Sequence, residues 1–208
     1  MNLTDKYLKI LKVIDMQIDF LTGVLKNPAA EAIIDAVIAE IEAWDGIIIA
    51  TRDTHFDDDT YYQSIEGKRL PIHCIYGTPG WEIEPRIMAA LKKKGAIIVD
   101  KHNFGFINWP KVMFDIDSTD QDAVAALTRG KNIRIRYTGT CTDICDASGW
   151  TIDRAWFPDA IIEVVDGATA ACYLNAEQNR QAQEAALTLA RSMLCDVLPT
   201  VYRGNHNG

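Results

Sequence analysis

The stretch LKILKVIDMQIDF, residues 8–20, begins with a short, largely apolar run and ends in acidic residues. Short β-branched or apolar runs recur along the chain, and several of them are apolar on both faces. Strands of this kind are typical of a parallel sheet that is covered by helices on both sides. We therefore predict strands at residues 8–14, 46–51, 96–99, 133–137 and 161–165, with residues 196–198 as a sixth candidate.

Longer segments with helical periodicity separate these runs, and we predict helices at residues 28–43, 84–94, 119–129, 143–157 and 175–194. Alternating strands and helices form right-handed βαβ crossovers. The sequence thus predicts a three-layer α/β/α fold with a doubly wound, mostly parallel, six-stranded, Rossmann-like sheet. The length of 208 residues favours one domain over residues 1–208.

The composition excludes several classes of protein. With 48% hydrophobic and 24% charged residues, the chain resembles ordinary globular proteins and not disordered ones. A net charge of −8 disfavours nucleic acid and anionic lipid as partners. The apolar runs are far shorter than the roughly 18 residues that cross a bilayer, and the N-terminal sequence lacks a secretory signal. Five cysteines, an odd number, indicate free thiols, and we expect a cytoplasmic protein.

Ligands of doubly wound sheets bind beyond the carboxyl ends of the strands, so the residues that end each strand are the candidates for chemistry. Asp15 follows the first strand, and a carboxylate there is suited to accept a proton if a partly apolar site raises its pKa. Asp15 and Asp19 are equally compatible with turn or helix-capping roles, and Asp19 fits those roles better. Lys101 follows the third strand and is compatible with an exposed strand-end lysine.

Cys145 lies about two residues inside a predicted helix, with Thr142 or Asp143 as the N-cap. A helix N-terminus and a nearby Lys101 favour the thiolate form of a cysteine. The amides of Cys141 and Cys145 are also placed to stabilise an oxyanion. A lone helical cysteine is more often a small buried apolar residue. A metal or redox pair of these two cysteines lacks the two-residue spacing of such pairs.

Residues 53–81 form a long segment without clear periodicity, and segments of this length inside a domain are usually functional or disordered. Asp53 and His55, two residues apart in an extended segment, point to the same side, and His73 lies later in the segment. Two histidines and a carboxylate suit Zn, Fe, Mn or Co. Glu66 is the candidate for a fourth ligand, and weaker candidates are Asp57, Asp58, Asp59 and His102. The alternative to a metal site is an acidic loop whose histidines bind no metal.

Five blocks occur in one order along the chain and together resemble the isochorismatase-like cysteine hydrolases, particularly the nicotinamidase (pyrazinamidase/nicotinamidase) branch. They are VIDMQIDF (13–20), TRDTH (51–55), LPIHCIYGTPGWEIEP (70–85), DKHNFGF (100–106) and GTCTDICD (139–146). The Pro-x-His-Cys-x-x-Gly-Thr-x-Gly segment is the block that points to the nicotinamidase branch. The resemblance implies hydrolysis of a small carboxamide, nicotinamide, to nicotinate and ammonia for NAD salvage.

The resemblance further implies a catalytic triad of Asp15, Lys101 and Cys145 that acts through a Cys145 thioester. It implies a non-proline cis peptide just before Thr142, which presents the Cys141 amide to the oxyanion. The resemblance also supports a divalent metal, zinc first with manganese or iron as alternatives, which would mainly orient the pyridine ring and water. The metal ligands would be Asp53, His55 and His73, and a loop carboxylate in some members raises Glu66 as the fourth.

We expect the substrate pocket to include Gln17, Phe20, Leu70, Phe104 and Thr142. Many nicotinamidases carry Trp at the position of Leu70, so one aromatic wall is missing, and Phe20, Phe104, Phe106 or Trp109 is expected to replace it. Stacking contributes about 0.5–1.5 kcal/mol beyond burial, so its loss weakens binding without forbidding it. Asp146 also departs from the family, which often has an apolar residue there.

Three alternatives stay open at this point. Another amidohydrolase of the superfamily, acting on a different carboxamide or a carbamoyl compound, usually lacks the two-histidine site. Isochorismatase itself needs no cysteine nucleophile, so Cys145 would have no role in it. A non-catalytic binding module would not need the triad residues. A homo-oligomer is compatible with the sequence, since acidic enzymes of this size often form symmetric dimers or tetramers.

Overall fold

The computed structural model describes residues 7–117, 119–120, 122–124 and 132–202. Six parallel strands form one sheet in the order β3-β2-β1-β4-β5-β6. This is the strand order of doubly wound dinucleotide-binding folds, and it confirms the predicted α/β fold, the sixth strand included. The strands are β1 (Tyr7–Ile14), β2 (Ile47–Asp53), β3 (Ile97–Lys101), β4 (Asn132–Thr140), β5 (Ile161–Ala170) and β6 (Asp196–Pro199).

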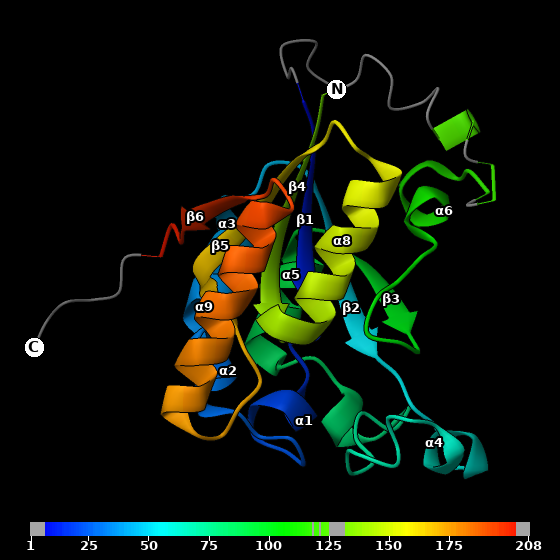
Figure 1. Ribbon diagram of the computed structural model, residues 1–208, viewed down its shortest axis with the longest axis vertical. Coiled ribbons are helices and arrows are strands. Elements are labelled where there is room, and N and C mark those ends of the chain that lie inside the picture. Colours follow the sequence, from blue (N-terminus) through cyan, green and yellow to red (C-terminus); the bar gives the residue numbers. More distant parts are fainter. Residues whose placement is uncertain (1–6, 118, 121, 125–131, 203–208) are drawn as a thin grey trace, which may run out of the picture.

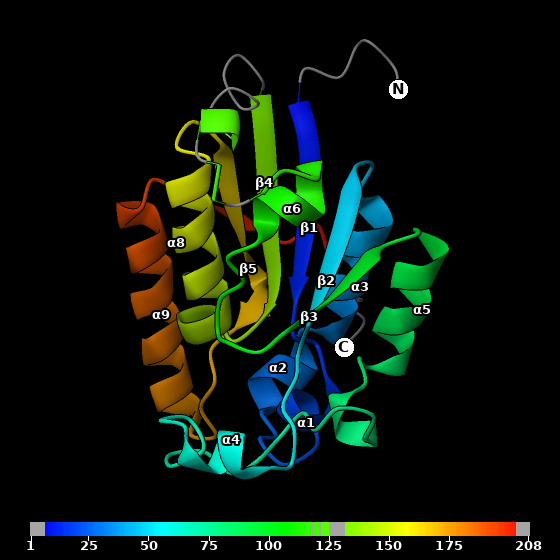
Figure 2. The ribbon, with the colours of Figure 1, turned by 90° about the vertical axis from the view of Figure 1, so that its right-hand side faces the viewer.

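Helices cover both faces of the sheet, as Figure 2 shows, with α8 and α9 on one side and α3 and α5 on the other. Side chains of β1 alternate between the two layers: Leu11 and Val13 pack with α3 and α5, whereas Ile10 and Ile14 pack on the opposite face. The helical elements are α1 (Ile18–Leu21), α2 (Pro28–Ala32), α3 (Ile34–Ala43), α4 (Asp59–Gln63), η1 (Pro79–Trp81), α5 (Pro85–Lys93), α6 (Trp109–Phe114), η2 (Thr142–Asp146), α8 (Ala147–Trp156) and α9 (Ala176–Ser192).

The predicted helix over residues 28–43 is wrong as one element, because the chain breaks at Ile33 into α2 and α3. Consecutive residues of a continuous helix point about 100° apart, yet Ile33 and Ile34 are both buried in the same apolar cluster. The break allows both side chains to reach that cluster. The predicted helix over 119–129 lies largely outside the described residues. No helix of the described part is both long and apolar enough to cross a membrane.

The segment 53–81 is ordered by short helices and by bridges to neighbouring chain. The Asp58 carboxylate caps α4 by accepting hydrogen bonds from the amides of Thr60 and Tyr61. Isolated β-bridges join His55 to Ile75 and Gln17 to Ile83. The strands run downward in Figure 1, so α1, α4 and this segment lie together at the carboxyl edge of the sheet.

Candidate active site and metal site

Four predicted site residues meet at the carboxyl edge of the sheet. Asp15 directly follows β1, Asp53 ends β2 and Lys101 ends β3, while Cys145 lies in the helical turn that follows β4. In the β2–β3 register, Asp53 is the direct partner of Lys101. The strand order β3-β2-β1-β4 therefore brings together residues that lie 130 positions apart in the sequence, from Asp15 to Cys145.

Lys101 is the centre of this group. Its Nζ lies 2.7 Å from Asp15 Oδ2, 3.3 Å from Asp53 Oδ1 and 3.7 Å from Cys145 Sγ. The ammonium also donates to the Asn103 carbonyl at 3.1 Å. Although burial lowers the pKa of Lys101, its neighbours Asp15, Cys145 and Asp53 raise it well above 10.5. Lys101 is therefore a permanent cation in the site.

Asp15 is fully buried and is held in place by Thr51 as well as by Lys101. The Thr51 hydroxyl donates to Asp15 Oδ1 at 2.7 Å and accepts the Asp15 amide at 3.2 Å. The backbone of Asp15 has φ = 47°, a left-handed conformation that non-glycine residues adopt rarely, and such backbone strain is often found at functional sites. Burial raises the pKa of Asp15 above 3.8, against the lowering effect of Lys101. A carboxylate with a raised pKa is a stronger base.

The Cys145 segment differs in three details from the sequence-based expectation. The non-proline cis peptide joins Thr140 to Cys141, one residue earlier than expected. The residue at the N-cap position is Cys141, because the helical turn already begins at Thr142. Burial, with the anions of Asp15 and Asp53, raises the pKa of the Cys145 thiol well above 9 despite Lys101. Lys101 acts on Cys145 in the expected direction, but burial and the two carboxylates outweigh its effect on the pKa.

The four predicted metal ligands form one cluster. One ligand atom from each of Asp53, His55, Glu66 and His73 lies within 4.8 Å of all the others. Asp53 Oδ2 is 3.0 Å from His55 Nε2 and 3.3 Å from His73 Nε2, and Glu66 Oε1 is 3.6 Å from both nitrogens. The weaker candidate His102 lies outside the cluster, because its Nδ1 contacts the Thr54 carbonyl at 2.8 Å.

The donor set of this cluster fits a divalent cation. His73 Nδ1 lies 2.9 Å from the Pro71 carbonyl, a contact that leaves Nε2 directed at Asp53. Burial lowers the pKa of His55, but its interactions with the carboxylates of Asp53 and Glu66 raise it to about 9. Glu66 Oε1 is buried without a hydrogen-bond partner among the described residues. Two imidazole nitrogens and two carboxylates are ligands that zinc, manganese and iron accept.

The sequence analysis missed the role of two residues that support the ligands of this cluster through hydrogen bonds. Asp19, expected as a turn or helix-capping residue, is buried and its Oδ2 accepts the amide of Cys74 at 2.7 Å, directly after His73. The Gln17 carboxamide accepts the Asp53 amide at 2.7 Å and donates to the carbonyls of Asp53 and Trp81, each at 2.8 Å. The spacing of Asp15, Gln17 and Asp19, each two residues apart, is the signal that was available in the sequence.

One cavity of about 470 Å³ is lined both by Cys145 and by the metal-ligand candidates Asp53, Glu66 and His73. The predicted pocket residues Phe20, Leu70 and Phe104 line it as well. Gln17 and Thr142 are fully buried and do not line this cavity, contrary to the expected pocket role; Gln17 instead supports Asp53 through its hydrogen bonds. Phe106 and Trp109 lie elsewhere, packed against each other.

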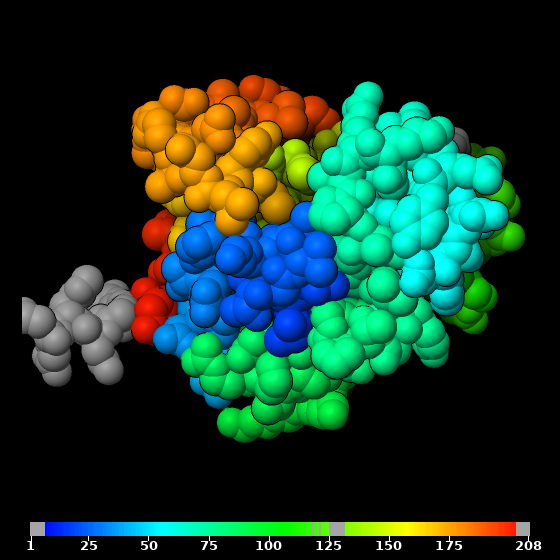
Figure 3. All heavy atoms as spheres, turned by 90° about the horizontal axis from the view of Figure 1, so that it is seen from below, coloured from blue at the N-terminus to red at the C-terminus, as the bar shows by residue number. Residues whose placement is uncertain are grey.

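Figure 3 views this edge of the molecule from below. The teal segment near residues 55–80 and the orange segment near residues 170–180 lie on either side, and yellow-green atoms of the region between β4 and α8 show between them. The cavity is thus bordered by segments that follow β1, β2, β4 and β5.

Comparison with solved structures finds proteins of similar fold. A pyrazinamidase/nicotinamidase of Streptococcus mutans is 25% identical, with a TM-score of 0.67 over 91% of this chain and 99% of the other. A zinc-complexed pyrazinamidase of Pyrococcus horikoshii is 21% identical (TM-score 0.65; 92% and 99% covered). The N-carbamoylsarcosine amidase of Thermoplasma acidophilum is 19% identical (TM-score 0.64; 95% and 99% covered).

The structures below 25% identity show only the shared fold, and a search of curated proteins finds no match. The sequence itself gives the family. The family model of the isochorismatase domain matches residues 9–199, which include every strand from β2 to β6, most of β1 and all the site residues described above. The chain therefore belongs to the isochorismatase family of hydrolases.

Proposed function

We propose that this chain is a metal-dependent amidohydrolase that converts nicotinamide to nicotinate and ammonia through a Cys145 thioester. The observation that carries the proposal is the position of Asp53 between the two groups. Its Oδ1 lies 3.3 Å from Lys101, which contacts Cys145, and its Oδ2 lies 3.0 Å from His55. A nucleophile and a metal-ligating cluster therefore share one carboxylate and one cavity.

In the proposed reaction, Asp15 takes the proton of the Cys145 thiol; both groups lie next to Lys101 Nζ, at 2.7 Å from Asp15 Oδ2 and 3.7 Å from Cys145 Sγ. The sulfur attacks the carboxamide carbon, and the amides of Cys141 and Cys145 stabilise the developing oxyanion. Lys101, whose ammonium contacts both Asp15 and Asp53, offsets part of their negative charge while this charge moves. Asp15 then gives its proton to the departing ammonia. Water adds to the thioester, nicotinate leaves, and the cysteine regains its proton.

Asp53, His55, Glu66 and His73 would hold the metal, with zinc first and manganese or iron as alternatives. When bound, the ion supplies a Lewis acid and an orienting point for the substrate ring and water. Phe20, whose ring lies 5.4 Å from that of His73, and Phe104 provide the aromatic surface in the cavity. The similarity to pyrazinamidases, one of them complexed with zinc, supports this assignment.

A second candidate is the hydrolysis of another carboxamide or of a carbamoyl compound by the same residues. Two observations favour it. N-carbamoylsarcosine amidase shares the fold. The aliphatic Leu70 stands in the cavity lining where the resemblance leads us to expect an aromatic ring. The chemistry at Cys145 is the same in both candidates, so the two differ only in what the cavity accepts.

The test is ammonia release from nicotinamide by protein stripped of metal, repeated after addition of zinc, manganese or iron. We expect release that requires a metal and that Cys145→Ala abolishes. Cys195→Ala is the matched control, because Cys195 is a buried thiol outside the cavity. Release from an N-carbamoyl amino acid but not from nicotinamide would establish the second candidate. No release from either would exclude both substrates.

A further inference from the structure

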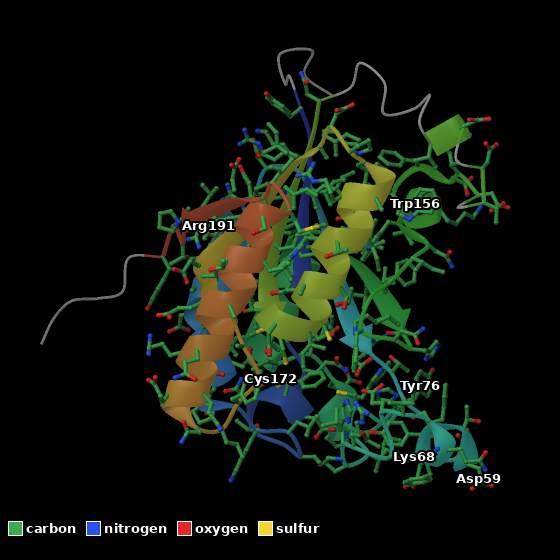
Figure 4. The ribbon with its side chains drawn as sticks, in the orientation of Figure 1. Asp59, Lys68, Tyr76, Trp156, Cys172 and Arg191 are labelled. Carbon is green, nitrogen blue, oxygen red and sulfur yellow. The ribbon has the colours of Figure 1, made fainter. Side chains whose placement is uncertain are left out.

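Two thiols other than the proposed nucleophile meet at the end of neighbouring strands. The register of β4 and β5 pairs Thr140 with Ala170, so Cys141 and Cys172 follow within two residues of a paired position. The backbone is fixed on both sides, since the Thr140 hydroxyl donates to the Ala170 carbonyl at 3.1 Å and the Asn27 carboxamide donates to the Ala171 carbonyl at 2.5 Å. Figure 4 labels Cys172 where the chain leads from β5 towards α9.

The side chains of these two cysteines interact, and each changes the pKa of the other. The interaction with Cys141 lowers the pKa of Cys172 below 9 against the effect of burial. Burial raises the pKa of Cys141 well above 9, and the interaction with Cys172 raises it further. Cys172 is half-buried and Cys141 is buried, and both line the cavity that contains Cys145. The pair thus consists of a reachable sulfur and a buried partner.

We propose that Cys141 and Cys172 are a modification site, a dithiol that a peroxide oxidises to a reversible disulfide at the wall of the substrate cavity. The Cys172 thiolate attacks one peroxide oxygen, the O–O bond breaks, and a sulfenic acid forms with release of hydroxide, which becomes water. The Cys141 sulfur then attacks the Cys172 sulfur. The S–O bond breaks, the S–S bond forms, and the second oxygen leaves as water with the Cys141 proton. A dithiol reductant reverses the reaction.

The disulfide would alter the cavity at a sensitive position. Cys141 is one of the two residues whose amides are proposed to bind the oxyanion, and its carbonyl accepts the amides of Ile144 and Asp146. The Cys172 amide donates to the Asp143 carboxylate at 3.2 Å, so the Cys172 segment is also tied to the turn that carries Cys145. Oxidation is therefore expected to inhibit hydrolysis, a consequence that rests on the proposed function, whereas the disulfide itself does not.

The test uses the full chain, treated with hydrogen peroxide and mapped by mass spectrometry of non-reduced peptides. We expect the free thiols to fall from five to three, a linked Cys141–Cys172 peptide that lacks two hydrogens, and full recovery with dithiothreitol. Cys172→Ser should retain all four remaining thiols at the same peroxide dose, and Cys195→Ser should still form the linked peptide. The peptide map does not depend on any substrate, so it separates this inference from the proposed function.

Two results would overturn the inference. One is a disulfide between Cys145 and either of the other two cysteines. The other is oxidation of Cys145 alone while Cys141 and Cys172 remain thiols. If the linked peptide forms and ammonia release is lost and then restored by dithiothreitol, both the modification and its effect on the site are established.

Discussion

At the scale of single residues, Lys101 is the cation that forms ion pairs with two buried carboxylates, Asp15 and Asp53. Lys101→Met should lower the free energy of unfolding by about 3–5 kcal/mol, because breaking a buried ion pair leaves uncompensated charge. Urea denaturation of metal-free protein measures the loss. Hydrolysis should fall as well, since the variant lacks the ammonium that lies 3.7 Å from Cys145 Sγ.

The double variant Lys101→Met/Asp15→Asn distinguishes charge from packing. Replacing Asp15 removes one of the two carboxylates that Lys101→Met leaves without a cation, which should return part of the lost stability. The double variant should therefore be more stable than the sum of the two single losses predicts. Strict additivity would show that Lys101 stabilises the fold through packing and not through its charge.

Asp146 is a second buried acid, adjacent to Cys145, and neither of its carboxylate oxygens has a hydrogen-bond partner among the described residues. Burial and the nearby anions Asp15 and Asp143 raise its pKa well above 3.8. The folded state therefore binds this proton more tightly than the unfolded state. Its contribution to stability is complete below pH 3.8 and is lost as the pH rises through the folded-state pKa.

Asp146→Asn keeps the shape of the side chain and does not titrate. We expect the stability of this variant, relative to the unmodified chain, to improve with rising pH, by about 1–3 kcal/mol in total. Urea denaturation across a pH series measures the difference, with the exposed Asp159→Asn as the control. A difference that does not change with pH would contradict the raised pKa.

At the scale of elements, the segment from β2 to α5 is positioned by contacts with the chain that follows β1. Asp19 accepts the Cys74 amide at 2.7 Å and the Val24 amide at 3.2 Å. Asp19→Ala should weaken metal binding by about 10–100-fold, the usual effect of losing a residue that supports a ligand. Asp19→Asn, which keeps an acceptor oxygen, should weaken it less. Titration of the metal-free protein with zinc measures both.

A substitution at Gly80 tests the contact between Asp19 and the Cys74 amide by displacing Asp19 instead of removing it. A Cβ at this position would lie 2.3–2.4 Å from the Asp19 carboxyl group, so Gly80→Ala must displace Asp19. We expect a metal affinity close to that of Asp19→Ala. An unchanged affinity in both variants would show that the position of His73 does not depend on Asp19.

Some of these elements could be predicted from the sequence and others could not. Strand ends were predictable, because a parallel sheet places Asp15, Asp53 and Lys101 at one edge whatever its exact register. The break at Ile33 was not predictable, because helical periodicity does not show that two adjacent isoleucines, Ile33 and Ile34, are both buried in the core. The role of Asp19 was equally hidden, since its partner amide at Cys74 lies 55 residues away in a segment without periodicity.

At the scale of the whole molecule, the metal-ligating cluster joins the sheet to the segment 53–81. Asp53 ends β2, and Glu66 and His73 come from the middle of that segment. A cation that binds only the folded chain stabilises it by about 2.7 kcal/mol at a free concentration of 100 times its Kd. A chain of this size gains about 2–4 °C in Tm per kcal/mol, so we expect zinc to raise Tm by about 5–11 °C. Scanning fluorimetry over a zinc series, with a chelator to reverse the shift, measures this.

His73→Ala should remove the metal-dependent rise in Tm, because it deletes a buried ligand. His102→Ala is the matched control: it also deletes a histidine, directly after β3, but one that contacts the Thr54 carbonyl and not the cluster. The rise should also grow with zinc concentration, since binding is linked to folding through mass action. An equal rise in both variants would mean that zinc acts elsewhere on the molecule, and the cluster would then lose its place in the proposed function.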